Sequence, residues 1–81
     1  MKDAPLKVNE IYVPAARRKT FEEGKATALA EDILENGLQR PIQVRQGKER
    51  YVLVEGLHRL EAVKLLGEEE INGYIVRARQ F

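Results

Sequence analysis

The sequence predicts a small mixed α/β domain in which two helices pack on one sheet. Three observations lead to this prediction. Short runs of alternating apolar and polar residues, typical of strands, recur along the chain. Two longer segments carry apolar residues at helical spacing, and a glycine follows each of them. The expected order of elements is strand, helix, strand, strand, helix, strand.

The bulk composition limits the class of protein. With 81 residues the chain is expected to form a single domain over residues 1–81. Hydrophobic residues make up 43% and charged residues 33%, which is typical of a folded globular protein. The formal net charge is +1, so any basic surface that attracts nucleic acid must come from local clustering.

Several classes of site and location are excluded or disfavoured. The chain has no cysteine, which excludes disulfides, cysteine nucleophiles and thiolate metal sites. No apolar segment approaches the roughly 18 residues that cross a bilayer, and the N-terminus lacks the apolar core of a signal peptide. We therefore expect a cytoplasmic, bacterial-type small protein without a membrane partner.

The N-terminal half is expected to hold one strand and one helix. Residues 6–14, LKVNEIYVP, read as a strand that ends at a proline, because proline cannot donate to a ladder. Residues 20–36 contain an amphipathic helix with a glycine directly after it. Thr20 and Glu23 are spaced as a capping box at its start, although Gly24 leaves a later start open.

The C-terminal half is expected to hold a hairpin, a second helix and a last strand. The turn QGKE separates strands at residues 42–45 and 51–54, which predicts the hairpin. Residues 57–66 form the helix, Gly67 ends it, and residues 71–77 form the strand. The apolar face of this helix is expected to consist of Leu57, Leu60, Ala62, Val63, Leu65 and Leu66.

The stretch VEGLHRLEAVKLLG predicts a phosphate site. Gly56 lies where a strand joins a helix, and the first turn of a helix carries unpaired N–H groups and a partial positive charge. Arg59 adds a planar fork that grips phosphate, and His58 adds an imidazole donor. The alternative is an ordinary strand-to-helix turn in which Arg59 pairs with Glu55 or Glu61.

Three segments resemble a known family. LAEDILENGLQRPIQVR, YVLVEGLHRLEAVKLLG and INGYIVR are similar to the ParB-like N-terminal domain shared by ParB partition proteins and sulfiredoxins, over about residues 6–79. The second segment resembles the family's G-x-x-R-x-x-A box, with Gly56, Arg59 and Ala62. The resemblance implies a ParB/sulfiredoxin-like fold. It also implies that Gly56, Leu57, His58 and Arg59 bind nucleotide phosphates, as ParB proteins bind CTP and sulfiredoxins bind ATP.

The chain departs from both branches of this family. Leu57 stands where sulfiredoxins carry the catalytic cysteine, so sulfinic acid reductase activity is not expected. Lys25 aligns with a sulfiredoxin lysine near the nucleotide, but the serine and threonine that accompany it are absent. His58 replaces the first of two adjacent arginines in the ParB box. The sequence ends before the ParB helix-turn-helix, so DNA is expected to bind only weakly or indirectly.

Further residues are candidates for contacts with the nucleotide. By resemblance, Gln39 and Arg40 follow the first helix in a loop near the base or phosphates, and Arg17 or Arg18 reaches the phosphates from an earlier loop. The alternative in each case is an ordinary solvated loop. Glu55 is the one candidate catalytic group, as a base or as a ligand of Mg²⁺ through water, and the alternative is a pair with the box arginine. No histidines and carboxylates are spaced for a metal site of the protein itself, so Mg²⁺ is expected only together with a nucleotide.

Three functions remain open from the sequence. The first is a regulatory, nucleotide-phosphate-binding module for CTP or ATP, associated with a partition or DNA-bound complex and with a protein partner. The second is a small nucleotide-dependent enzyme, a kinase or nucleotidase. The third is a degenerate member that lost its ligand and acts through protein contacts. The missing cysteine favours the first and third over catalysis.

Overall fold

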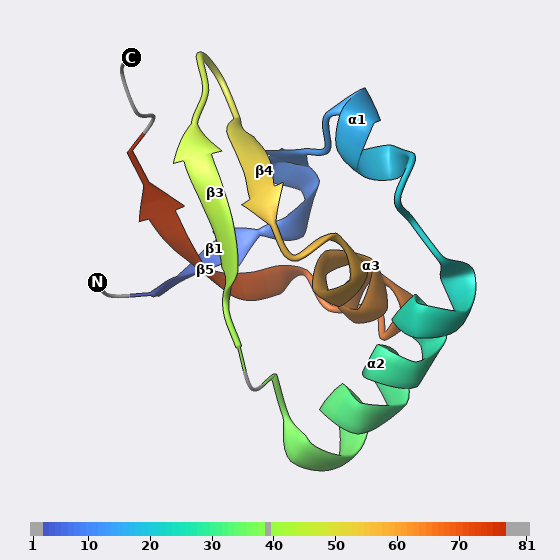
Figure 1. Cartoon of the computed structure of the whole chain (residues 1–81). Coiled ribbons are helices and arrows are strands. Elements are labelled where there is room, and N and C mark those ends of the chain that lie inside the picture. The colour runs from blue at the N-terminus through green and yellow to red at the C-terminus, as the bar shows by residue number, and fades with distance from the viewer. Residues whose placement is uncertain (1–2, 39, 78–81) are drawn as a thin grey trace.

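Two long helices lie on one side of a five-stranded sheet in the computed structural model of the chain, which describes residues 3–38 and 40–77 (Figure 1). The expected mixed α/β fold is thereby confirmed. In chain order the elements are β1 (Ala4–Lys7), a 3₁₀ helix (Val8–Glu10), β2 (Ile11–Tyr12), α1 (Ala15–Arg18), α2 (Glu23–Asn36), β3 (Ile42–Gln46), β4 (Tyr51–Glu55), α3 (Leu57–Leu65) and β5 (Glu70–Val76).

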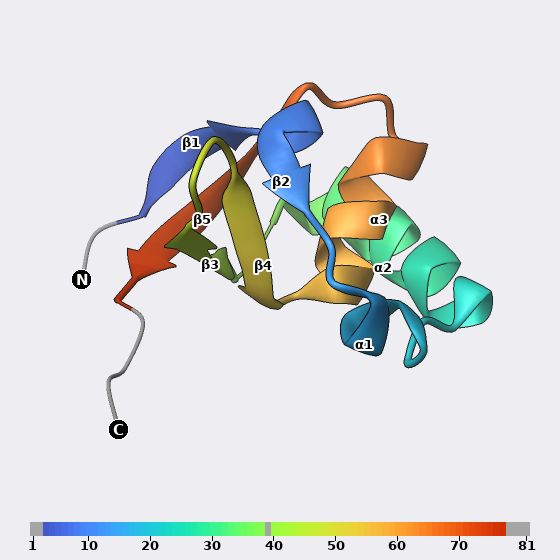
Figure 2. The same ribbon diagram turned by 90° about the horizontal axis from the view of Figure 1, so that it is seen from above.

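The sheet mixes parallel and antiparallel pairs in the order β1-β5-β3-β4-β2 (Figure 2). The expected hairpin is present, since β3 and β4 pair antiparallel with Val44 opposite Leu53. The last strand, β5, lies between β1 and β3, antiparallel to the first and parallel to the second. The sheet is therefore completed by pairing between the two ends of the described chain.

The N-terminal strand expected over residues 6–14 is wrong as a single element. It is divided into β1 and β2, which lie at opposite edges of the sheet and are joined by the 3₁₀ helix. The reason is a change of phase in the apolar pattern. Leu6 and Val8 are buried two residues apart, but the next buried residue is Ile11, three positions later, which a helical turn accommodates and a strand does not. The N–H of Val8 donates to the carbonyl of Glu69 at 2.9 Å, which anchors this turn next to the start of β5.

The capping box expected at Thr20 and Glu23 is also wrong. The Thr20 hydroxyl donates to the carbonyl of Arg17 at 2.8 Å and so closes the short helix α1, which the sequence pattern did not predict. The N-cap residue of α2 is Glu22, without a side-chain cap, and Glu23 is the first helical residue. The long helix therefore starts three residues after Thr20.

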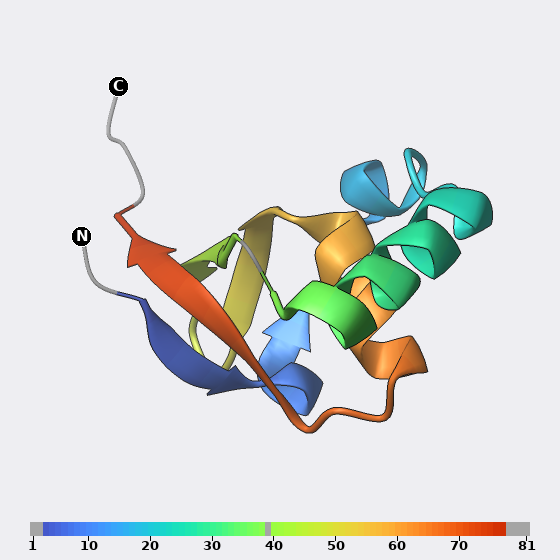
Figure 3. The same cartoon turned by 90° about the horizontal axis from the view of Figure 1, so that it is seen from below.

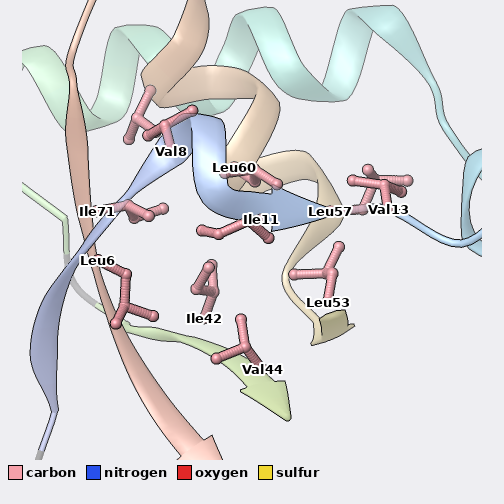
Figure 4. Packing of buried hydrophobic residues seen from close by; sticks show 11 residues of the cluster. Leu6, Val8, Ile11, Val13, Ile42, Val44, Leu53, Leu57, Leu60 and Ile71 are labelled. Atoms are coloured by element: carbon pink, nitrogen blue, oxygen red, sulfur yellow. The ribbon is translucent and has the colours of Figure 1, made fainter. Parts of the chain in front are cut away.

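Aliphatic side chains from the sheet, the 3₁₀ helix and α3 converge in one core (Figure 4). Ile42, Val44 and Leu60 are fully enclosed. α3 lies between the sheet and α2 (Figure 3), and small buried residues, Ala26 and Ala30, stand on the α2 side. The expected apolar face of α3 is confirmed for Leu57, Leu60, Ala62 and Val63.

Leu65 does not belong to that face. Its side chain is 62% exposed, because five positions after Leu60 the helix has turned roughly 140° away from the core-facing direction. In the parts of the chain described here, no helix is long and apolar enough to cross a membrane.

Candidate functional site: the N-terminus of α3

Gly56 makes the turn between β4 and α3, and the structure demands a glycine there for two reasons. Its φ of 109° lies in the left-handed region, which other residues rarely adopt. In addition, a Cβ atom at this position would lie 2.6 Å from Cγ2 of Ile42, a fully buried residue. The strand therefore enters the helix with its backbone pressed against the core, and no side chain at the turn shields the backbone of the first helical turn.

The first turn of α3 presents free backbone donors. The first hydrogen bond of the helix runs from the N–H of Leu60 to the carbonyl of Gly56 at 2.9 Å, and no side chain caps the helix. The N–H groups of Leu57, His58 and Arg59 consequently have no acceptor within the helix. With the partial positive charge of the helix end, they provide what an anion needs in order to bind.

An open cleft of about 480 Å³ lies in front of these donors. One wall is the N-terminal half of α2 and the other is the turn into α3. Its lining consists of Lys25, Ala28, Leu29, Glu55, Gly56, Leu57, His58 and Arg59. The expected box residues and Lys25, which is 31 positions earlier in the sequence than Gly56, are thus brought to one cleft.

Arg59 also lines a second, smaller hollow of about 160 Å³, together with Arg40 and Asp32. The side chain of Arg59 is half-buried, and it forms no ion pair with any described residue. Arg40 is exposed. Because Arg59 lines both the cleft and the smaller hollow, the positive charges of Lys25, Arg59 and Arg40 lie along one surface next to the N-terminus of α3.

His58 is oriented by a contact that the sequence did not predict. Its Nε2 atom accepts a hydrogen bond of 2.9 Å from the backbone N–H of Glu22, the N-cap residue of α2. Its ring also stacks on Phe21, with the ring centroids 5.6 Å apart and the planes 14° from parallel. An imidazole that accepts at Nε2 is neutral and carries its proton on Nδ1. His58 thus joins the N-terminus of α3 to the N-terminus of α2.

Lys25 is held at the mouth of the cleft by Glu22. The ammonium lies 2.8 Å from the Glu22 carboxylate, and both side chains are mostly exposed. The hydrogen bond and the charge of Lys25 lower the pKa of the Glu22 carboxyl. Because exposed ion pairs of this kind are weak, an incoming anion can compete with Glu22 for Lys25.

The other sequence candidates fall in different places. Glu55 is exposed and lines the cleft beside Gly56. Arg18 lines a separate hollow with Phe21 and Leu57, whereas Arg17 lines a groove on the opposite face of the sheet. Gln39 lies outside the described residues. Over the described ranges, no three histidines or carboxylates gather in a way that would hold a metal ion.

Sequence reasoning did not identify Phe21, Glu22 and Leu29 as part of this region. The Phe21 side chain is 38% exposed, and its ring stacks on that of His58. The contact joins residues 36 or 37 positions apart, so no local spacing in the sequence indicates it. The apolar periodicity of α2 did predict that Leu29 belongs to a helix, but not that it lines the cleft.

Comparison with known proteins shows the family to which the sequence belongs. The profile of the ParB N-terminal domain matches residues 4–80. The chain belongs to the ParB N-terminal domain family. Among its relatives is a probable chromosome-partitioning protein ParB of Campylobacter jejuni, 40% identical over 62 residues, which are 76% of this chain and 22% of the relative. The chain spans about a fifth of the length of the curated relatives it matches.

Solved structures share this ParB-family fold. Sulfiredoxin from Arabidopsis thaliana superposes with a TM-score of 0.84 at 29% identity, covering 96% of this chain and 88% of sulfiredoxin. The C-terminally truncated ParB of Caulobacter crescentus, complexed with CTP-γ-S, superposes with a TM-score of 0.82 at 23% identity, covering 98% of this chain and 46% of that protein. Both neighbours expected from the sequence resemblance are thus confirmed for the fold.

Proposed function

We propose that this domain binds the phosphate groups of a nucleotide, CTP or ATP, at the N-terminus of α3. One observation carries the proposal: the uncapped first turn of α3 opens into a cleft that also receives Lys25 and the half-buried Arg59. Helix donors, a guanidinium and an ammonium together are the usual components of a phosphate site. The Caulobacter crescentus ParB of the same fold, crystallised with CTP-γ-S, supports a nucleotide as the ligand.

In the proposed site each group has its own task. The N–H groups of Leu57, His58 and Arg59 bind the oxygens of one phosphate, and the Arg59 guanidinium binds the next. Lys25 exchanges its contact with Glu22 for a phosphate oxygen. Arg40, next to Arg59, extends the positive surface toward the rest of the nucleotide. Mg²⁺ is proposed to accompany the phosphates, with Glu55 as the nearest carboxylate able to hold it through water.

We further propose a regulatory role in a partition or other DNA-bound complex. Family membership and the partitioning relative from Campylobacter jejuni support this setting. The domain then acts on a protein partner, and DNA takes part weakly or indirectly. In such a role the nucleotide changes the affinity for the partner rather than being consumed.

The test is a titration of ¹⁵N-labelled protein with CTP, ATP, ADP and inorganic phosphate, each with and without Mg²⁺. We expect saturable amide shifts centred on residues 56–59. Arg59→Ala is expected to weaken binding at least tenfold while the spectrum stays that of a folded protein, because a charge-assisted hydrogen bond is lost and no ion pair within the described domain is broken. Lys48→Ala, a change at an exposed cation in the turn between β3 and β4, serves as the matched control.

The outcomes separate the functions. No shift at millimolar nucleotide would show that the turn is purely structural and would leave the domain as a protein-interaction module. Turnover of ATP or CTP that disappears in Glu55→Gln would favour the small enzyme instead, because Glu55 is the carboxylate that lines the cleft. Binding without turnover supports the regulatory module.

A further inference from the structure

A second groove lies on the face of the sheet that points away from the core. It has a volume of about 580 Å³ and shares no residue with the cleft at the α3 N-terminus. One wall is the start of α1, and the floor is the outer face of β3, β4 and β5. Its lining consists of Pro14, Ala16, Arg17, Arg45, Val52, Leu53, Val54, Val76 and Arg77.

The floor of this groove is aliphatic with an arginine at its centre. Arg45 on β3 pairs in register with Val52 on β4 and with Val76 on β5. Val52 pairs in turn with Tyr12 on the edge strand β2, so these four residues form one row across the sheet. Directly opposed residues in a sheet lie side by side on the same face. The chain therefore presents a guanidinium between two valines, on the face opposite the buried Val44.

The charge of the groove differs from that of the whole chain. The chain as a whole is nearly neutral, with 14 basic and 13 acidic residues. The groove, in contrast, is lined by Arg17, Arg45 and Arg77 and by no carboxylate. All three arginines are exposed, and none of them forms an ion pair within the described residues. Over residues 3–38 and 40–77, no carboxylate therefore lies within ion-pair distance of these three guanidinium groups.

We propose that this groove binds an acidic segment of a partner protein that also carries aliphatic side chains. Carboxylates on the segment pair with Arg17, Arg45 and Arg77, because guanidinium groups match carboxylates with two parallel hydrogen bonds. Its aliphatic side chains cover the half-buried Val54 and Val76, which removes apolar surface from water. The three arginines indicate that the partner segment is negatively charged, and the valines of the floor indicate that it also carries apolar side chains.

The floor favours a peptide over single-stranded nucleic acid. Proteins that hold single strands rely on aromatic side chains on which the bases stack. The apolar residues that line this groove are aliphatic, alanine or proline. The aromatic residue on the same row, Tyr12, does not line the groove, and the Arg50 guanidinium covers its ring at 3.8 Å from the centroid. Aliphatic side chains of a peptide pack on such a surface, whereas bases gain little from it. The proposal is independent of nucleotide binding, because the two sites lie on different faces.

The test uses three blocked hexapeptides, ELELEL, QLQLQL and KLKLKL, titrated into methyl-labelled protein. We expect ELELEL to shift the methyl signals of Val52, Val54 and Val76 saturably, and QLQLQL to bind at least fivefold more weakly. Arg45→Gln is expected to weaken ELELEL binding about tenfold, because charge-assisted hydrogen bonds are lost. Lys48→Gln, which removes a positive charge outside the groove, should leave binding unchanged.

Three results would overturn the proposal. They are equal affinity for ELELEL and QLQLQL, the absence of shifts at the three valines at millimolar ELELEL, and tighter binding of a ten-residue oligothymidylate at the same valines. The last would assign the groove to nucleic acid. If the domain binds no nucleotide but still binds ELELEL at these valines, the proposed function is refuted and the peptide groove is supported.

Discussion

Replacement of Gly56 by alanine tests the structural basis of the α3 N-terminus. An L-residue in the left-handed conformation costs about 1–2 kcal/mol. The new Cβ would also lie 2.6 Å from Cγ2 and 3.0 Å from Cβ of Ile42, and overpacking of a filled core costs about 1–3 kcal/mol. We therefore expect Gly56→Ala to lower the free energy of unfolding by about 2–5 kcal/mol, a large share of what a domain of this size possesses.

Gly67, directly after α3, supplies the matched control. Its φ of 74° is also left-handed, but no atom lies within 4 Å of the position that a Cβ would take. Gly67→Ala should therefore lose only the backbone part, about 1–2 kcal/mol. The effect of alanine on the unfolded chain is similar at both positions and cancels in the comparison.

The assay is urea unfolding of both variants and the parent, followed by circular dichroism with a shared slope. The expected result is a larger loss for Gly56→Ala than for Gly67→Ala, by about 1–3 kcal/mol. Combining Gly56→Ala with Ile42→Ala should be less destabilising than the sum of the two single changes, because the contact partner is gone. Equal losses at the two glycines would refute the argument that Ile42 excludes a side chain at Gly56.

Three further predictions concern the surroundings of the cleft and the core. His58→Ala removes the acceptor for the Glu22 N–H, so this variant should shift the Glu22 amide signal and speed its hydrogen exchange; no change in either would argue against this contact. Lys25→Met should raise the pKa of Glu22, seen in its carboxyl ¹³C shift. Because that pKa is lowered in the folded protein, the Glu22–Lys25 pair stabilises the fold at neutral pH, and this contribution is lost as pH falls through the lowered value. Leu60→Ala should lower the free energy of unfolding by about 2–5 kcal/mol, because this side chain is fully buried. Leu65→Ala should lower it by less than about 0.5 kcal/mol, because this side chain is largely exposed. Both values are measured by urea unfolding, and similar losses would contradict the assigned core.

The sequence was sufficient for elements whose stabilising contacts are local. The hairpin of β3 and β4 and the body of α2 each follow from periodicity and turn residues within a short segment. The sequence also indicated the role of Gly56, because a glycine between a strand and a helix allows a backbone conformation that other residues rarely adopt. Its second reason, the approach to Ile42, depends on a residue 14 positions earlier and needed the structure.

Features that depend on distant partners could not be predicted. The phase change between Val8 and Ile11 marks where the first strand breaks, but the strands that its two parts pair with, β5 for Leu6 and β4 for Ile11, are not visible in the local pattern. The orientation of His58 likewise depends on Glu22 and Phe21 from another helix start. In the candidate site, the residue types were therefore identified from the sequence, whereas the walls and the orientation of the imidazole were not.

The position of β5 inside the sheet has a consequence for the order in which the domain is built during translation. Leu6 on the first strand can pair only when Ile71 has been synthesised, 65 residues later. Until then the hairpin and helices can form, but β1 has no neighbour and β3 is open along one side. Contacts between such distant positions slow folding. Before β5 has been made, the first strand and one side of β3 therefore expose unpaired backbone groups, which β5 covers when it pairs between them.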